Sequence, residues 1–329
     1  MERKIIFKAR VGSHLHGTNT PESDEDYLGV FLPSTEDLLG LQGRPKEMTD
    51  NIKVSKGPRN EAGDVDCKYL ALYTFLKEAA QGQSQALELL FIPEEHVIIK
   101  TPEWDKILNN KHILLSRQGI TPFIGFAKAQ AAKAIVKGEN LRVIQSFIKT
   151  ITKNDGIDVH KTLEYYVTPE KDTYKLFGES LKRETAKDGI DILKISGRGY
   201  NLGLTIKRFL NSLQILEQKY GTRVRAAAED IYDFKSVTHC FRLLSEATEY
   251  LETGHITFPR PDRQELIKIK KKQYNGDLDV DIEQKIDYIR QVVEPKSNLP
   301  PKPNYKKIDD LCQTMLLDHI NYYWMKQWE

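Results

Sequence analysis

Two aspartates separated by one residue lie between a run of turn-forming residues and an apolar segment. This arrangement limits the possible folds more strongly than any other feature of the sequence. Asp24 and Asp26 begin an expected strand that continues from Tyr27 to Leu32. Side chains two residues apart on a strand leave the same face, so these two carboxylates would lie close together. Like charges held that close repel each other unless a cation lies between them. Because oxygen ligands on one face suit Mg²⁺ or Mn²⁺, the pair predicts a divalent-cation site.

An earlier expected strand, residues 3–11, ends at Gly12 and Ser13, and ten residues separate Ser13 from Asp24. Gly12 lets the backbone approach a bulky anion because no side chain stands in the way. Ser13 would open the next helix and offer its hydroxyl group and free N–H groups to phosphate oxygens. Ser23, which directly precedes the first aspartate, joins these two as an expected nucleotide-binding residue. A strand, a Gly-Ser turn, a helix and a returning strand together predict a site for a triphosphate and a metal.

The alternative is that Ser23, Asp24 and Asp26 are only turn residues between two strands. An Asp-x-Asp pair is common by itself and has little predictive value alone. The Gly-Ser turn at this spacing favours the catalytic interpretation.

This combination of motifs resembles a known family. Gly12-Ser13, ten residues and Asp24-x-Asp26 are similar to the signature of the DNA polymerase β-like nucleotidyltransferase superfamily. The longer string resembles the predicted nucleotidyltransferases of bacteria and phages, through Gly17, Pro21, Ser23 and Gly29. The resemblance covers about residues 1–95 and, more weakly, residues 225–275.

The resemblance implies a third carboxylate on a neighbouring strand. Asp66 has the distance to the following helix that fits the family pattern, whereas Asp64, on the same strand face, is its competitor. Asp24, Asp26 and Asp66 would then be the metal ligands and catalytic residues, with Mg²⁺ or Mn²⁺ as cofactor. The implied reaction transfers a nucleoside monophosphate from a nucleoside triphosphate to a hydroxyl acceptor and releases pyrophosphate.

The chain departs from that group at two places. Leu28 stands where the group often has arginine, and Gln83-Ser84 replaces a usual Asn-Pro. These differences bear on the substrate more than on the metal site.

A second set of candidate residues lies on an expected helix near residue 240. Lys235, His239 and Arg242 are spaced i, i+4 and i+7, so one helix face would present all three to the triphosphate or to an acceptor nucleic acid. The alternative is a partly buried helix whose polar side chains bond to neighbours.

Three further polar residues lie in or near the expected site. Glu88, in an apolar segment, is interpreted as a structural hydrogen-bonding residue rather than a catalyst. His14 and His16 are expected to line the loop, with phosphate contact as the alternative.

The periodicity of apolar residues predicts an α+β fold. Residues 1–100 are expected to form a small nucleotidyltransferase domain, with a mixed sheet and flanking helices, in which Leu87–Ile92 is a short strand. Residues 101–329 are expected to form a mainly helical C-terminal region with a helix break at Gly138. The polar stretch of residues 153–200 is compatible with an insertion.

The acceptor is not determined by the sequence. Basic residues recur through residues 128–149 and 194–225, which slightly favours RNA or tRNA, although solvated helix faces explain each of these runs at least as well. A protein hydroxyl group or a small molecule is also compatible. A different class of function is a nucleotide-binding antitoxin or sensor with little turnover, which would act through a protein partner. A purely structural or DNA-binding role is disfavoured because the sequence has no helix-turn-helix or zinc pattern.

Cysteine usage and hydropathy indicate the cellular compartment of the protein. The three cysteines are far apart, which disfavours a disulfide framework and fits a reducing compartment. No segment approaches the roughly 18 apolar residues of a membrane helix, and the N-terminus lacks a signal-peptide pattern. We therefore expect a cytoplasmic protein with no membrane partner.

Overall fold

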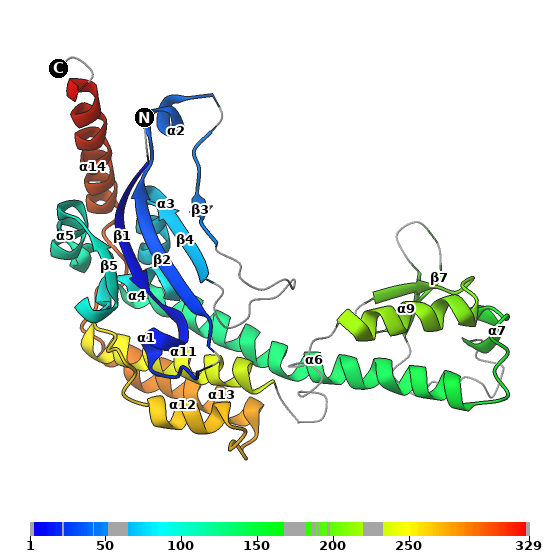
Figure 1. The fold of residues 1–329 in the computed structure, drawn as a ribbon. Coiled ribbons are helices and arrows are strands. Elements are labelled where there is room, and N and C mark those ends of the chain that lie inside the picture. The colour runs from blue at the N-terminus through cyan, green and yellow to red at the C-terminus, as the bar shows by residue number, and fades with distance from the viewer. Residues whose placement is uncertain are drawn as a thin grey trace. The chain divides into compact units, whose positions relative to one another are not determined.

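The computed structural model forms two compact units, which are described separately (Figure 1). The first unit comprises Met1–Ala129 and Thr238–Glu329, and the second comprises Gln130–Val237. Helices α6 (Ile120–Lys153) and α11 (Phe234–Thr253) have residues in both units. The structure describes residues 3–21, 23–41, 43–51, 65–167, 182–185, 189, 191–195, 198–219 and 233–326.

The first unit is built on a five-stranded mixed sheet with the order β3-β4-β2-β1-β5. Strand β2 is antiparallel to β1 and parallel to β4, so β2 and β4 begin at the same edge of the sheet. Strands β3 and β5 are antiparallel to their neighbours. The strands are β1 (Lys4–Arg10), β2 (Glu25–Leu32), β3 (Glu47–Thr49), β4 (Val65–Ala71) and β5 (Val97–Lys100).

Helices pack against this sheet through aromatic side chains. The ring of Trp104 stacks on Phe7 of β1 with centroids 4.1 Å apart, and it also contacts Phe75 at 5.1 Å. Trp104 belongs to α5 and Phe75 to α3, so these contacts pack both helices against the sheet. The helices wholly in this unit are α1 (Gly12–His16), α2 (Thr35–Leu39), α3 (Leu72–Ala80), α4 (Ser84–Glu88), α5 (Pro102–Asn109), α12 (Arg263–Lys270), α13 (Leu278–Tyr288) and α14 (Tyr305–Lys326).

The second unit combines helices with a small antiparallel sheet, whose three strands were not expected. Strand β7 lies between β6 and β8. One buried cluster joins α6 and α9 through residues such as Phe147 and Phe209, whose rings meet edge to face at 6.3 Å. The elements are α7 (Leu163–Val167), β6 (Lys182–Thr185), β7 (Asp191–Ile195), β8 (Arg198–Asn201) and α9 (Ile206–Lys219).

The fold is α+β, as the sequence predicted: a mixed N-terminal sheet with helices is followed by mainly helical chain. The expected boundary at residue 100 does not coincide with the boundary between the units, because residues 101–129 and the chain after residue 238 group with the N-terminal sheet. The stretch of residues 153–200 lies inside the second unit. Within the described part of the chain, no helix is long and apolar enough to cross a membrane.

Two local predictions were wrong. The apolar run Leu87–Ile92 forms the end of α4 and the 3₁₀ turn η1 (Leu89–Phe91) rather than a strand. A short apolar run does not distinguish a strand from a buried helical segment. Helix α6 also continues through Gly138 without a break, because a single glycine inside a helix costs only about 1 kcal/mol.

Candidate active site

Asp26 and Asp66 are direct partners in the parallel pairing of β2 with β4. Side chains alternate between the two faces of a sheet, so directly paired residues project from the same face. Both residues are half-buried, and Asp24 immediately precedes β2 with the same parity as Asp26. The structure therefore brings Asp26 and Asp66 together at the edge where both strands begin. Asp64 lies outside the described residues.

Gly12 packs directly against the Asp26 carboxylate. A Cβ atom on Gly12 would lie 2.4 Å from Asp26 Oδ2, so no larger residue fits without moving that carboxylate. The backbone of Gly12 has a φ of +66°, which glycine adopts without strain. Directly before it, the Val11 N–H donates to the Asp26 carbonyl oxygen at 2.8 Å. The glycine turn and the start of β2 are therefore fixed to each other at two points.

Ser13 and Ser23 lie near the two ends of the segment that connects β1 to β2. Ser13 is half-buried in α1, and its carbonyl oxygen accepts a hydrogen bond from the Thr18 N–H at 2.9 Å. The Ser23 hydroxyl oxygen accepts from the Thr20 N–H at 2.9 Å. Ser23 thus closes the turn that leads into Asp24, which is a structural role beside the expected nucleotide contact.

The oxygen-rich set formed by Asp24, Asp26 and Asp66 fits a divalent cation. Carboxylates are the ligands that Mg²⁺ and Mn²⁺ prefer, and the pairing of β2 with β4 gathers two of them on one face. Gly12 leaves space for backbone atoms, rather than a side chain, beside this carboxylate pair.

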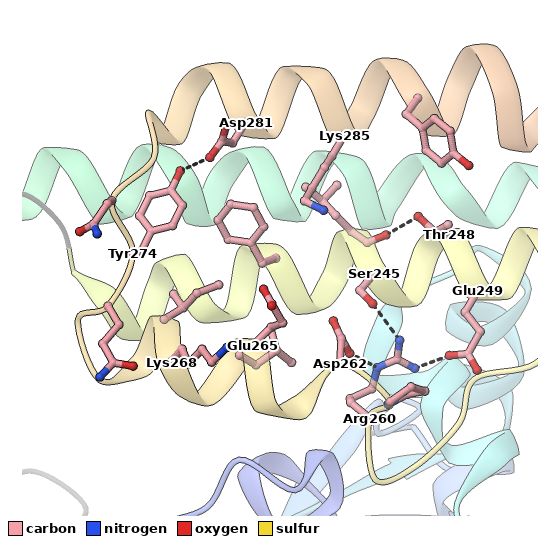
Figure 2. Close-up of a pocket in the computed structure, with 18 of the residues that line it drawn as sticks. Ser245, Thr248, Glu249, Arg260, Asp262, Glu265, Lys268, Tyr274, Asp281 and Lys285 are labelled. Carbon is pink, nitrogen blue, oxygen red and sulfur yellow. Dashed lines mark hydrogen bonds and ion pairs between the residues drawn. The ribbon is translucent and has the colours of Figure 1, made fainter.

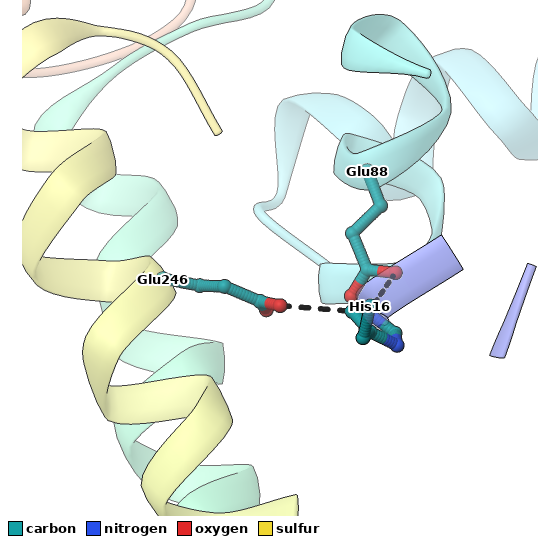
Figure 3. A group of neighbouring side chains, drawn as sticks. All are labelled: His16, Glu88 and Glu246. Atoms are coloured by element: carbon teal, nitrogen blue, oxygen red, sulfur yellow. Dashed lines mark ion pairs between the residues drawn. The ribbon is translucent and has the colours of Figure 1, made fainter. Parts of the chain in front are cut away.

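A second group with metal-binding residue types does not fit a cation. His16, Glu88 and Glu246 place one ligand atom each within 4.8 Å of the others, and Figure 3 shows His16 between the two carboxylates. However, Arg242 Nη1 lies 2.9 Å from Glu88 Oε1, 2.6 Å from Glu246 Oε1 and 2.7 Å from His16 Nε2. The guanidinium group already supplies the positive charge, and it would repel a metal ion from the same atoms.

Arg242 is therefore a buried ion-pair residue in the structure. Its side chain is only 7% exposed, and Nη2 lies 3.2 Å from His239 Nδ1. His239 is half-buried and meets the Phe126 ring edge to face, whereas Lys235 is exposed. The structure does not place Arg242 on an open cationic surface, and the alternative of a partly buried helix describes it better. A nucleotide contact of Lys235 or His239 stays a prediction.

The buried cluster sets the protonation of its members. Burial raises the pKa of Glu88, but the charge of Arg242 and the hydrogen bonds outweigh burial and lower that pKa to about 2. Burial and the Arg242 charge lower the pKa of His16, so its ring is neutral at physiological pH. Glu88 therefore acts as a structural anion, as its sequence context indicated.

Glu246 and Arg260 complete this cluster, and neither was identified from the sequence. Glu246 is fully buried and pairs with Arg242 four residues earlier on α11, a spacing that offered a signal. Arg260 is 1% exposed, and its N–H donates to the His16 carbonyl oxygen at 3.2 Å. No sequence periodicity marks Arg260, because it lies in the irregular segment between α11 and α12. His14, also in α1, is half-buried.

A cavity of about 730 Å³ lies beside α11, α12 and α13 (Figure 2). Arg260 forms part of its wall, donating to Ser245 Oγ at 3.1 Å and to the Glu249 carboxylate. Its lining mixes both charge signs, with Glu252 and Glu265 beside Lys268 and Lys285. Asp24, Asp26 and Asp66 are not among the lining residues, so the cavity is separate from the paired aspartates.

Comparisons with known proteins give a family model that matches the N-terminal part of the chain and a relative that aligns over nearly all of it. A model of the RlaP family, described as the RNA repair pathway DNA polymerase beta family, matches residues 1–150. The chain is 25% identical, over an aligned length of 336 residues, to an uncharacterized 38.9 kDa protein from the nrdC–mobD intergenic region of Enterobacteria phage T4. That alignment covers 97% of this chain and 99% of the phage protein. No solved structure matches the chain.

The match includes every strand of the first sheet and the turn that carries Gly12. At the level of the family it supports a nucleotidyltransferase-type activity on a nucleotide substrate, and such enzymes generally use divalent metals. The matched segment builds the sheet edge where Asp26 faces Asp66, and the phage relative aligns over nearly the whole chain, so the comparisons support a likeness of residues 1–150 to the polymerase β-like nucleotidyltransferase family.

Proposed function

We propose that this protein transfers a nucleoside monophosphate from a nucleoside triphosphate to a hydroxyl group of RNA. The hydroxyl oxygen attacks the α-phosphorus, a new phosphodiester bond forms, and the bond to the β-phosphate breaks to release pyrophosphate. Asp24, Asp26 and Asp66 are the catalytic residues of this proposal.

The observation that carries the proposal is the register of β2 and β4. It makes Asp26 and Asp66 direct neighbours, while Gly12 packs against one of them. Two carboxylates at directly paired positions repel each other, and a divalent cation between them would offset that repulsion. Divalent cations held there would supply positive charge to the triphosphate during the transfer. The chain itself would hold the metal-binding carboxylates in place and keep the Gly12 backbone close to the phosphates. Asp66 would accept the proton that the attacking hydroxyl group releases.

RNA is proposed as the acceptor because the family description names an RNA repair pathway and because the second unit is basic. Residues 130–237 contain 19 lysines and arginines against 14 acidic residues, whereas the rest of the chain contains 30 against 33. Arg142, Lys149 and Lys153 are exposed on α6. At 3.6 residues per turn they fall within about 40° of one another around the helix, opposite the residues that enter the buried cluster. This face suits the phosphates of a nucleic acid.

The test is a transfer assay with each α-³²P-labelled nucleoside triphosphate, Mg²⁺ or Mn²⁺, and total RNA beside total protein. The wild type is compared with Asp26→Asn and Asp66→Asn. We expect label on RNA only, and a loss of at least a hundredfold in both variants because each removes a charged metal ligand.

Glu25→Gln is the matched control, since it removes a carboxylate from the same strand but on the opposite face, where Glu25 accepts from Tyr27. It should keep its transfer activity and melt at the same temperature as the Asn variants. Label on protein would replace RNA as the acceptor. No transfer under any condition, with nucleotide binding intact, would favour the sensor or antitoxin interpretation.

A further inference from the structure

We propose that His16 is a positioning residue that holds the Gly12 turn against the Asp26 carboxylate, so that the buried ion cluster around Arg242 sets the geometry of the metal site. The functional meaning of this inference rests on the function proposed above. Its structural part, a link from Arg242 through His16 and Gly12 to Asp26, rests on contacts that do not depend on the reaction.

The first step of the link is the contact between Arg242 and His16. Arg242 Nη1 lies 2.7 Å from His16 Nε2. Nε2 also lies 3.3 Å from Glu88 Oε2, but the shorter contact with Arg242 requires an acceptor because arginine only donates hydrogen bonds. The proposal therefore places the single proton of the neutral ring on Nδ1. Arg242 is itself fixed, because Glu88 and Glu246 accept from the same Nη1 at 2.9 and 2.6 Å. One orientation of the imidazole follows from this arrangement, with Nε2 directed at Arg242. Figure 3 shows the same ring beside the carboxylates of Glu88 and Glu246.

The second step joins His16 to Gly12 within α1. Gly12 and His16 are the first and last residues of α1, and the Gly12 backbone, acting as a hydrogen-bond partner of the His16 ring, is one of the groups that raise the pKa of that ring. Since Nε2 faces Arg242, the protonated Nδ1 is the atom left to donate to the Gly12 carbonyl oxygen. The carbonyl end of α1 is held as well, because the Arg260 N–H donates to the His16 carbonyl oxygen at 3.2 Å.

The third step is the close approach of Gly12 to Asp26. A Cβ atom on Gly12 would be 2.4 Å from Asp26 Oδ2 and 3.3 Å from Asp26 Cγ, so the glycine backbone lies against that carboxylate. A shift of the Gly12 turn by a few tenths of an ångström would therefore change the space available to Asp26. Partners that orient metal ligands from outside the coordination sphere commonly change metal affinity or activity by 10- to 100-fold when removed.

Two substitutions separate the two bonds of His16. The amide of asparagine replaces the ring at the position of Nδ1 and keeps a donor for the Gly12 carbonyl oxygen. The amide of glutamine reaches the position of Nε2 and keeps a partner for Arg242. The experiment compares His16→Asn with His16→Gln by Mn²⁺ titration followed by electron paramagnetic resonance, by kcat and KM, and by thermal melting. Tyr250→Phe, a buried substitution on α11 whose hydroxyl group bonds to the Ser116 backbone, controls for lost stability.

The expected result is that His16→Gln lowers Mn²⁺ affinity and kcat about tenfold or more, while His16→Asn retains most of both at an equal or lower melting temperature. KM for the nucleotide should change less than kcat. Equal Mn²⁺ affinity in the two variants, or losses that follow the melting temperature and recur in Tyr250→Phe, would overturn the proposal. If the wild type transfers no nucleotide, the Mn²⁺ titration still decides the positioning role, so the two proposals fail separately.

Discussion

The α-carbon of Gly12 lies so close to Asp26 that a methyl group there would overlap Oδ2, at 2.4 Å. Gly12→Ala must therefore displace the carboxylate or the turn, and its φ of +66° adds strain of about 1–2 kcal/mol. We expect Mn²⁺ affinity, measured by titration, to fall at least tenfold.

Gly43→Ala is the matched control, because Gly43 has a φ of +82° but nothing within 4 Å of the added atom. It should show the backbone strain in a thermal melt and leave Mn²⁺ affinity unchanged. Equal Mn²⁺ affinities in the two alanine variants would contradict a close contact between Gly12 and Asp26.

Arg242→Met should destabilise the protein strongly. The substitution leaves the ionised Glu88 carboxylate buried without the cation that neutralises it and removes the hydrogen bond to the buried Glu246 carboxyl group, which typically costs about 3–5 kcal/mol. The measurement is urea unfolding without nucleotide. Lys235→Met removes the same charge from an exposed position on the same helix and should change the free energy of unfolding by less than about 0.5 kcal/mol. Similar small effects in both variants would mean that Arg242 does not stabilise the buried cluster.

Sequence spacing alone does not distinguish the exposed Lys235 from the buried Arg242. Lys235, His239 and Arg242 have the periodicity of one helix face, and α11 does form there, but partners distant in the chain decide which of them is accessible. Glu88 and His16 lie more than 150 residues from Arg242, so no local pattern predicts their contact. The same limit applies to Arg260.

The paired aspartates were easier to predict. Asp24 and Asp26 follow a turn and precede an apolar strand, so their shared face follows from the two-residue period of a strand. The placement of Asp66 came from the family resemblance, because the register of β2 against β4 is a long-range property that local patterns do not encode. The three strands β6, β7 and β8 escaped prediction because they lie within a polar stretch with little alternation.

The contribution of Glu88 to stability should depend on pH. Its pKa is lowered from 4.5 to about 2 in the folded protein, so the folded state favours the ionised form. The resulting stability is present above about pH 4.5 and is lost as the pH falls toward 2. The difference in unfolding free energy between the wild type and Glu88→Gln should therefore be largest near neutral pH and shrink below pH 4.5. Urea unfolding from pH 3 to 7 measures it.

The neighbouring Glu246 also titrates, since burial raises its pKa to about 8. Repeating the comparison in a Glu246→Gln background removes that second titration. A difference that grows as the pH falls would contradict an ionised Glu88.

Tyr250 ties α11 to the chain before α6 through two backbone groups. Its hydroxyl group accepts from the Ser116 N–H at 2.8 Å and donates to the Ser116 carbonyl oxygen at 2.9 Å. Tyr250→Phe leaves both buried groups without this partner, which should cost about 1–3 kcal/mol in urea unfolding. Mn²⁺ affinity should not change. A stability equal to that of the wild type would mean that another group, such as water, replaces the hydroxyl.

RNA binding should depend on the basic face of α6 if the second unit holds the acceptor. Lys149→Ala combined with Lys153→Ala removes two of the exposed cations that the structure describes on this face. Because each phosphate contact releases counterions, we expect weaker binding to RNA of any sequence and a shallower dependence of log K on log salt concentration. Fluorescence anisotropy with a labelled single-stranded RNA at several salt concentrations measures both quantities. The control, Lys306→Ala with Lys307→Ala, makes the same charge change at exposed positions of α14 in the first unit. An equal loss of affinity in both double variants would indicate a general charge effect and would argue against an acceptor site on α6.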